Sequence, residues 1–156
     1  HGPKPLIFKG QYSQQVRYAI DYINRNVDLD NESVAFLKPL GGGWFDEIKR
    51  QLSRSNLAYV TITKNRVWPR GPENIALSTM NSAKGLEFDH VIILGMNNTN
   101  MQHQTDENDD KLQRLRRLLG MAVSRAKISV LIGYKEEEKT DLVDYFTTGT
   151  FDEVIL

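Results

Sequence analysis

The feature that most constrains the fold is a polar segment enclosed by two apolar runs. Residues 75–77 and 90–94 form the apolar runs, and residues 78–85 between them carry hydroxyl, amide, ammonium and glycine groups, with Glu87 just beyond. Short apolar runs bounded by turn signals are typical of buried parallel strands. Polar loops at strand ends are where open α/β sheets bind ligands. The segment is therefore either an ordinary polar turn or a ligand-binding loop, and composition alone leaves both readings open.

Strand-like and helix-like segments alternate along the rest of the chain. Apolar residues at helical spacing predict helices at about 12–26, with Ser13 as the N-cap, and at about 44–53, 111–123 and 141–147. Short apolar runs predict strands at 5–9, 33–37, 57–62 and 128–132, with a last strand or an extended tail at 151–156. This alternation predicts an α/β fold in three layers, with a mainly parallel sheet and helices on both faces.

Length and charge limit the class of protein. The chain has 156 residues, enough for one domain over residues 1–156 with its own core. Its 20 basic and 20 acidic residues balance, so any contact with nucleic acid would have to be local. It has no cysteine, which excludes disulfides and cysteine-ligated metals and fits a reducing, cytoplasmic setting. No apolar run approaches the length of a membrane span, so we expect a soluble protein without a membrane partner.

The chain begins His1-Gly2-Pro3 without a methionine. We therefore expect a fragment of a longer protein, with a further domain upstream.

A glycine run at 41–43 precedes a predicted helix and has to be compared with a phosphate-binding loop. Such a loop requires G-x-x-x-x-G-K-[ST], in which the lysine and the hydroxyl contact phosphates and Mg²⁺. No lysine stands at that spacing with serine or threonine after it, and no acidic pair follows a strand in a Walker B context. We interpret the glycines as a turn, and we expect that the chain does not hold Mg·ATP in the P-loop manner by itself. We predict no metal site.

Two longer strings carry a family resemblance. Residues 79–88, TMNSAKGLEF, resemble the fifth conserved motif of UvrD/Rep-type superfamily 1 DNA helicases, T-x-H-S-A-K-G-L-E-F, with Asn81 in place of histidine. Residues 116–127, RRLLGMAVSRAK, resemble the sixth motif, R-R-L-x-Y-V-A-x-T-R-A-K, with Gly120 for tyrosine and Ser124 for threonine. The two strings occur in the order in which the family has them.

The resemblance implies a fold and an activity. UvrD-type helicases divide their ATPase between two RecA-like domains, and the chain is similar to the second, C-terminal one. The parent protein would couple ATP hydrolysis to 3′→5′ movement on single-stranded DNA, whereas the isolated chain would be inactive. The implied partners are single-stranded and duplex DNA and the N-terminal RecA-like domain of the same protein. The implied cofactors, ATP and Mg²⁺, would be held mainly by that first domain.

The resemblance also implies site residues. Arg125 would reach across the cleft as the catalytic arginine finger, a group that raises the rate of phosphoryl transfer by about 10³–10⁵; the alternative for an arginine at a helix end is a surface ion pair. ATP would be contacted by Arg125, Gly85 and Glu87, and the DNA backbone by Thr79, Asn81, Ser82 and Lys84. For Lys84, neutralising a phosphate and pairing near Glu87 stay open.

Besides these substitutions within the two motifs, the chain departs from the family in two further places. The fourth motif usually supplies a tyrosine and an arginine to the nucleotide, and the matching place here has Phe36-Leu37-Lys38-Pro39. Lys38 would supply a cation to ATP, but an ammonium does not reproduce the arginine's bidentate fork. The large accessory domain that many members insert before the fifth motif is absent, since only about a dozen residues, 63–74, fill that gap. The missing accessory domain makes the chain a compact variant. The altered fourth motif keeps an alternative open, a helicase-like domain without turnover that serves as a nucleic-acid-binding or docking module.

Overall fold

The computed structural model describes residues 5–38, 45–62, 74–79, 82–83, 85–96, 120, 124–134 and 152–156. The strands are β1 (Leu6–Lys9), β2 (Val34–Lys38), β3 (Val60–Thr61), β4 (Ile75–Thr79), β5 (Phe88–Met96), β6 (Ala126–Tyr134) and β7 (Asp152–Ile155), and the helices are α1 (Tyr12–Asn26) and α2 (Phe45–Arg54). Neither of these helices is long and apolar enough to cross a membrane.

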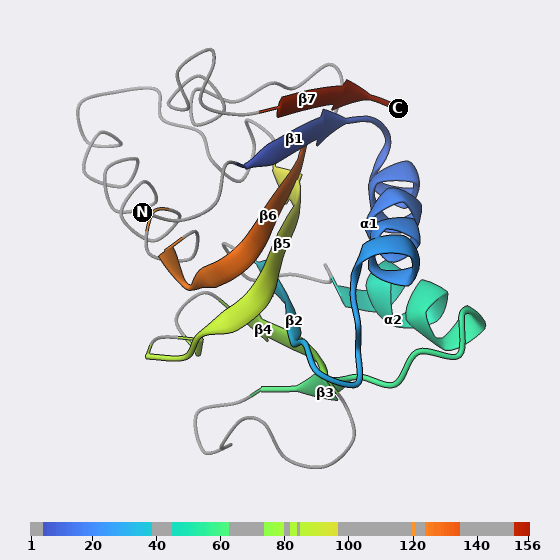
Figure 1. Cartoon of the computed structure of the whole chain (residues 1–156). Helices are drawn as coiled ribbons and strands as arrows, with labels where there is room; N and C mark the ends of the chain where they lie inside the picture. Colours follow the sequence, from blue (N-terminus) through green and yellow to red (C-terminus); the bar gives the residue numbers. More distant parts are fainter. Residues whose placement is uncertain are drawn as a thin grey trace, which may run out of the picture.

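The described strands form one sheet in the order β3-β4-β2-β5-β6-β1-β7, as Figure 1 shows. Each of the neighbouring pairs is parallel. Parallel neighbours have to be joined by crossovers, and β5 with its partners β2 and β6 consists largely of buried aliphatic residues, as expected for a sheet covered on both faces. The prediction of an α/β fold with a parallel sheet is confirmed.

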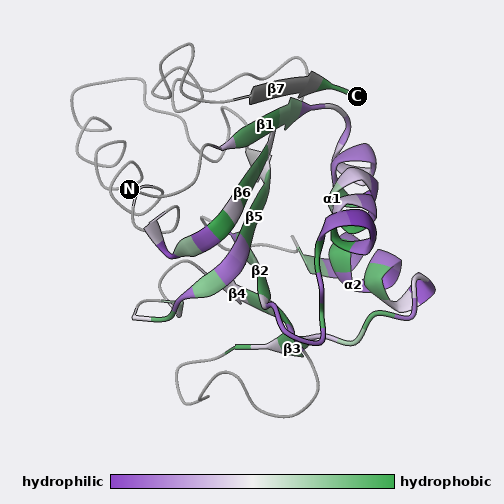
Figure 2. Ribbon diagram, viewed as in Figure 1, coloured by the Kyte–Doolittle hydropathy of each residue, from purple (hydrophilic) through white to green (hydrophobic). Residues whose placement is uncertain are grey.

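Both described helices pack on the same face of the sheet. Ile20 and Ile23 of α1 and Ile48 and Leu52 of α2 are buried in one cluster with Phe36 of β2. Figure 2 shows hydrophobic residues on the sides of α1 and α2 that face the strands and hydrophilic residues on their outer sides. This separation is the amphipathic pattern that drives a helix onto a sheet.

The opposite face of the sheet has a second apolar cluster, which includes Ile7, Leu37, Val91, Ile93 and Ile132, all at most 2% exposed. The helices predicted at 111–123 and 141–147 lie outside the described residues. The prediction of helices on both faces therefore stays a prediction for this second face.

Helix α1 begins at Tyr12, as predicted, but its N-cap residue differs from the prediction. Its N-cap is Gln11, not Ser13, and the Gln14 side chain accepts a hydrogen bond from the Gln11 N–H at 2.9 Å. Serine or aspartate is the usual N-cap residue, because its side chain accepts from an amide of the first turn. Here the side chain at the third helical position accepts from the amide of the N-cap residue, which is the reciprocal bond of a capping box. Burial and then the nearby Asp46 raise the pKa of Tyr12, so the first turn of α1 presents a neutral phenol to the first turn of α2.

The strand predicted at 57–62 is shorter in the structure. Asn56 adopts a left-handed backbone conformation with φ of 56°, and the Leu57 N–H donates to the Leu52 carbonyl at 2.9 Å. This is the hydrogen bond that closes a helix end, and asparagine tolerates the conformation it needs. Because the Leu57 amide is still bonded to the end of α2, the strand begins later than predicted, and β3 consists of Val60 and Thr61.

Gln15 joins α1 to the carboxyl ends of three strands. It is fully buried; its Nε2 donates to the Gly10 carbonyl at 2.8 Å, and its Oε1 accepts from the Gly95 N–H at 2.8 Å. Gly133 of β6 leaves room for it, since a Cβ there would lie 2.6 Å from the Gln15 Oε1. A buried amide that satisfies two backbone groups fixes β1, β5, β6 and α1 relative to one another.

We predict that Gln15→Leu lowers the free energy of unfolding by about 2–4 kcal/mol, because it leaves the Gly10 carbonyl and the Gly95 amide buried without partners. The exposed neighbour Gln14→Leu, which loses one solvent-accessible cap, should cost about 1 kcal/mol or less. Urea denaturation followed by circular dichroism measures both variants, and equal losses would contradict a specific role for Gln15.

Candidate functional site

The segment from Thr79 to Phe88 connects opposite ends of the sheet. Thr79 ends β4 beside Lys38, at the carboxyl end of β2, whereas β5 starts at Phe88, before the position where His90 pairs with Val34. Strands β4 and β5 flank β2 and run parallel to it. The connection therefore has to travel from the carboxyl edge of the sheet to the amino edge, and we call it the crossover (residues 79–88).

The described part of the crossover is compact. The Ser82 amide donates to the Thr79 Oγ1 at 3.0 Å, the Ala83 amide donates to the Thr79 carbonyl at 3.2 Å, and the Leu86 amide donates to the Ala83 carbonyl at 3.0 Å. Ala83 is buried in the apolar cluster on the sheet face opposite α1 and α2, and Leu86 packs against that cluster. The middle of the crossover thus packs on the sheet through Ala83 and Leu86, and its two ends, Thr79 and Phe88, belong to β4 and β5.

The carboxyl edge carries two of the four residues predicted to contact DNA. Thr79 is half-buried, and its hydroxyl orients the amide of Ser82, which is itself half-buried. Lys38 lies level with Thr79 in the neighbouring strand, and its Nζ is 5.1 Å from the centroid of the Phe45 ring at the start of α2. Asn81 and Lys84, the other two predicted DNA contacts, lie outside the described residues.

Two of the four residues predicted to contact ATP, Glu87 and Arg125, lie at the amino edge, and Gly85 lies in the crossover between the two edges. The Phe88 amide donates to the Arg125 carbonyl at 2.8 Å, which joins the end of the crossover to the start of β6. Glu87 and Lys127 are both exposed, with Oε2 and Nζ 3.7 Å apart. Gly85 is exposed with φ of 82°, a conformation that side-chain-bearing residues rarely adopt, and a Cβ there would meet no atom within 4 Å.

Arg125 is half-buried, and its Nε is buried without a hydrogen-bond partner within the part of the chain that the structure describes. A buried polar atom without a partner costs free energy and is uncommon in native structures. The Arg125 backbone is fixed by Phe88 while this donor stays unused. The Nε is therefore an unsatisfied donor that solvent does not reach.

Lys38 does not join the other residues predicted to contact ATP. The strand register puts it six residues along the sheet from the level of Phe88, roughly 20 Å at about 3.3 Å per residue. An extended lysine side chain does not cover that distance.

A polar network that the sequence did not reveal lies behind the amino edge. His90 is 1% exposed, with Nδ1 2.6 Å from the Ser129 Oγ and Nε2 2.9 Å from the Glu32 Oε1. Beside it, the Asp89 Oδ2 accepts from the Ser33 N–H at 2.9 Å, and the Ser33 hydroxyl accepts from the Asp89 N–H at 3.1 Å. These bonds lock the amino ends of β2, β5 and β6 directly behind Glu87 and Arg125.

The network had no usable sequence signal. His90 opens an apolar run and is separated from Glu32 by 58 positions and from Ser129 by 39. Only the strand order brings them together. Among the described residues, no three histidine, aspartate or glutamate side chains are grouped so that they could hold a metal ion.

The sequence of the chain is similar to those of known proteins. The family described as UvrD-like helicase C-terminal domain matches residues 46–137. The ATP-dependent DNA helicase Rep of Buchnera aphidicola is 32% identical over 85 residues, which are 54% of this chain and 12% of that protein. The protein of the same name from Salmonella typhimurium is 33% identical over 55 residues, 35% of this chain and 8% of that protein. The chain thus matches only a small part of the length of these relatives.

Solved structures share the fold. The C-terminal domain of a possible DNA helicase from Lactobacillus plantarum superposes with a TM-score of 0.72 at 21% identity, covering 98% of this chain and 86% of that one. Arterivirus nonstructural protein 10, a helicase solved with DNA, superposes with a TM-score of 0.56 at 10% identity, covering 97% of this chain and 35% of that one. At these identities the likeness establishes the α/β fold alone.

We predict that His90→Leu lowers the free energy of unfolding by about 2–4 kcal/mol, because Glu32 and Ser129 lose a shared partner in a poorly solvated place. Glu32→Gln keeps an acceptor for the imidazole and should cost about 1 kcal/mol or less. Thermal denaturation of both variants tests this difference. A larger loss for Glu32→Gln than for His90→Leu would show that the carboxylate, and not the ring, holds the network together.

Proposed function

Because the chain belongs to the UvrD-like helicase C-terminal domain family, we propose that it is the second motor domain of an ATP-dependent DNA helicase that moves 3′→5′ along single-stranded DNA. In this proposal a P-loop domain, the N-terminal RecA-like domain of the same protein, holds ATP and Mg²⁺. The present chain contributes an arginine to the nucleotide and backbone contacts to the DNA. The family match and the Rep relatives support a helicase; the polarity and the individual contacts are our inference.

The observation that carries the proposal is the course of the crossover. One short segment has the proposed DNA-contacting residues Thr79 and Ser82 at the carboxyl edge and the proposed nucleotide-contacting residues Gly85 and Glu87 toward the amino edge. Its middle is packed on the sheet through Ala83. We infer that a movement imposed at one end is passed to the other through these hydrogen-bonded residues, as a motor that couples hydrolysis to stepping requires.

On the nucleotide side, we assign the role of arginine finger to Arg125. Phosphoryl transfer spreads negative charge over the equatorial oxygens of the γ-phosphate, and a permanently charged guanidinium stabilises that charge. The position of Arg125 at the amino edge, where the Phe88 amide fixes its carbonyl, supports this role. Gly85 would let the backbone approach the nucleotide closely, and Glu87 would face the ribose. We leave Lys38 out of this group because of its distance along β2.

On the DNA side, we propose that Thr79, Asn81, Ser82 and Lys84 contact the sugar–phosphate backbone. Hydroxyl, amide and ammonium groups are the usual phosphate ligands, and they hold a strand without reading its sequence. Lys38 lies beside Thr79 and would add its charge at this edge instead of at the nucleotide. Bound ATP·Mg²⁺ would supply the driving reaction, while these residues hold and release the strand.

A second candidate function is a helicase-like domain without turnover that acts as a nucleic-acid-binding or docking module. The observation that favours it is the fourth-motif position, where Phe36-Leu37-Lys38-Pro39 replaces the expected tyrosine and arginine. The two proposals differ in whether Arg125 contributes to a reaction, so its substitution separates them.

We predict that Arg125→Ala in the full-length protein lowers DNA-stimulated ATP hydrolysis by at least about a hundredfold, with ATP binding retained, because the transition-state charge loses its guanidinium. Lys127→Ala is the matched control. It removes a nearby exposed cation whose ion pair with Glu87 is worth about 1 kcal/mol at most, and it should change the rate little. Steady-state ATPase assays and nucleotide-binding titrations measure both, and an unchanged rate in Arg125→Ala would favour the docking module.

We also predict that Thr79→Ala weakens single-stranded DNA binding by about fivefold to tenfold, because it removes a hydroxyl and releases the Ser82 amide that the hydroxyl orients. Thr79→Ser retains the hydroxyl and should bind as the parent does. Fluorescence anisotropy with a labelled oligonucleotide provides the measurement. Equal affinity of Thr79→Ala and the parent would remove Thr79 from the proposed DNA contacts.

A further inference from the structure

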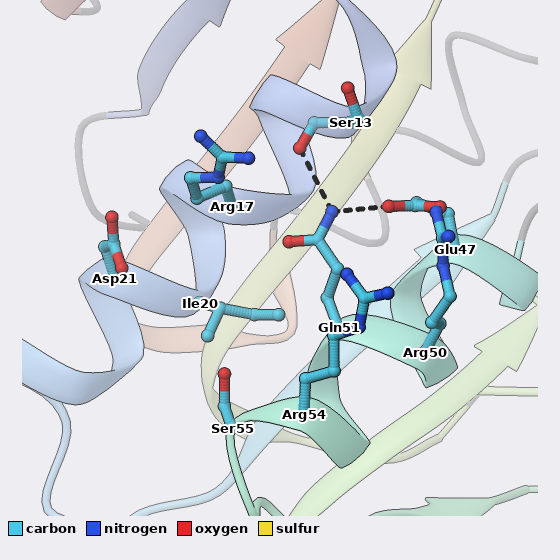
Figure 3. Close-up of a pocket in the computed structure, with 9 residues that line it drawn as sticks. All are labelled: Ser13, Arg17, Ile20, Asp21, Glu47, Arg50, Gln51, Arg54 and Ser55. Atoms are coloured by element: carbon cyan, nitrogen blue, oxygen red, sulfur yellow. Dashed lines mark hydrogen bonds and ion pairs between the residues drawn. The ribbon is translucent and has the colours of Figure 1, made fainter.

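The outer sides of α1 and α2 form a groove of about 370 Å³ that plays no part in the function proposed above (Figure 3). Arg17 stands on the α1 side, and Arg50 and Arg54 stand one turn apart on the α2 side. Ile20, 3% exposed, lies at its base. We propose that this groove binds the sugar–phosphate backbone of a second DNA segment, separate from the strand held at the crossover.

Two of the three arginines are available for a ligand. Glu47 is already bound by Arg50 and by the Gln51 Nε2, the latter at 2.5 Å. Arg17 and Arg54 are exposed and have no ionic partner among the described residues. Asp21 is the other carboxylate at the groove, so two unengaged guanidinium groups face one unengaged carboxylate. Arginine binds phosphate through two parallel hydrogen bonds, which makes this pair suited to neighbouring phosphates.

The groove is held in shape by the protein. The Gln51 Nε2 donates to the Ser13 carbonyl at 3.2 Å, which ties the first turn of α1 to α2 and closes one end of the groove, as the dashed line in Figure 3 shows. Both helices are anchored to the sheet by the buried cluster beneath them. The arginines therefore extend from two helices whose positions are fixed. Binding a linear polyanion would order the arginine side chains and would require no movement of the backbone.

The charge of the groove is local. The chain has 20 basic and 20 acidic residues, so the arginines do not simply reflect a basic protein. The groove lies on the sheet face that α1 and α2 cover, whereas Ala83 of the crossover packs on the opposite face. Neither Thr79 nor Ser82 lines the groove, so a strand in the groove would be a different segment from the one at Thr79. This inference rests on the proposed function in one respect only, that DNA is the polymer that the protein binds.

The test is the salt dependence of DNA binding by the double variant Arg17→Gln/Arg54→Gln in the full protein. Each phosphate contact contributes roughly 0.7 for single strands and roughly 0.9 for duplex DNA to the slope of log Kd against log salt concentration. Loss of two contacts should therefore lower the slope by roughly 1.4 or roughly 1.8. Fluorescence anisotropy between 50 and 200 mM salt, about the range over which such effects are large, provides the measurement.

Two matched variants accompany it. Arg25→Gln removes an exposed arginine of α1 that lies outside this groove and should leave the slope unchanged. Arg17→Lys/Arg54→Lys keeps both charges and should retain the slope of the parent. The thermal midpoint and the ATPase rate at saturating DNA should be the same in all variants, which separates a failure here from a failure of the role assigned to Arg125.

An unchanged slope in the double glutamine variant would overturn the proposal. The proposal would also be overturned if this double variant bound DNA as the parent does but lost affinity for poly-glutamate, since the groove would then be a site for an acidic polypeptide. If the double glutamine variant lowers the slope but Arg125→Ala leaves the ATPase rate unchanged, the proposed groove site is kept and only the motor role is rejected.

Discussion

Strands β4 and β5 both pair in parallel with β2, one on each side of it, and this pairing forces the connection between them to run the length of the sheet. A hairpin would return the chain on the edge where it left, but a parallel crossover has to deliver it to the other edge. Thr79 and Glu87 are therefore close in sequence and far apart in space. The proposed motor depends on this separation, because a single segment then contacts both DNA and nucleotide.

Each edge of the sheet has its own polar anchor. At the carboxyl edge, Gln15 satisfies the Gly10 carbonyl and the Gly95 amide. At the amino edge, His90 joins Glu32 and Ser129, and Asp89 joins Ser33. Hydrogen-bonded networks in buried places fix geometry because every alternative leaves a group unsatisfied. The edges at which the crossover begins and ends are thus held rigid, and Arg125 lies at the amino edge, where its carbonyl accepts from the Phe88 amide.

The distribution of charge follows from the same architecture. A chain with no net charge can bind a polyanion only where the fold gathers its cations. The fold does so between α1 and α2, where Arg17 and Arg54 come from helices that lie side by side on one face of the sheet. The proposed site for the transported strand lies at the carboxyl edge of the sheet, and the proposed site for a second DNA segment lies between α1 and α2.

The sequence by itself determined the local elements: the helix at 12–26 and the strands starting near Leu6, Val34 and Ile75 follow from apolar spacing that the structure retains. It also determined the family, since TMNSAKGLEF and RRLLGMAVSRAK are long enough to be specific. The tertiary structure decided which residues meet. Strand order put Lys38 beside Thr79 and away from Arg125, and it assembled the network of Glu32, His90 and Ser129. Periodicity reports which face a residue buries, whereas strand order depends on the packing of distant segments, which no local pattern encodes.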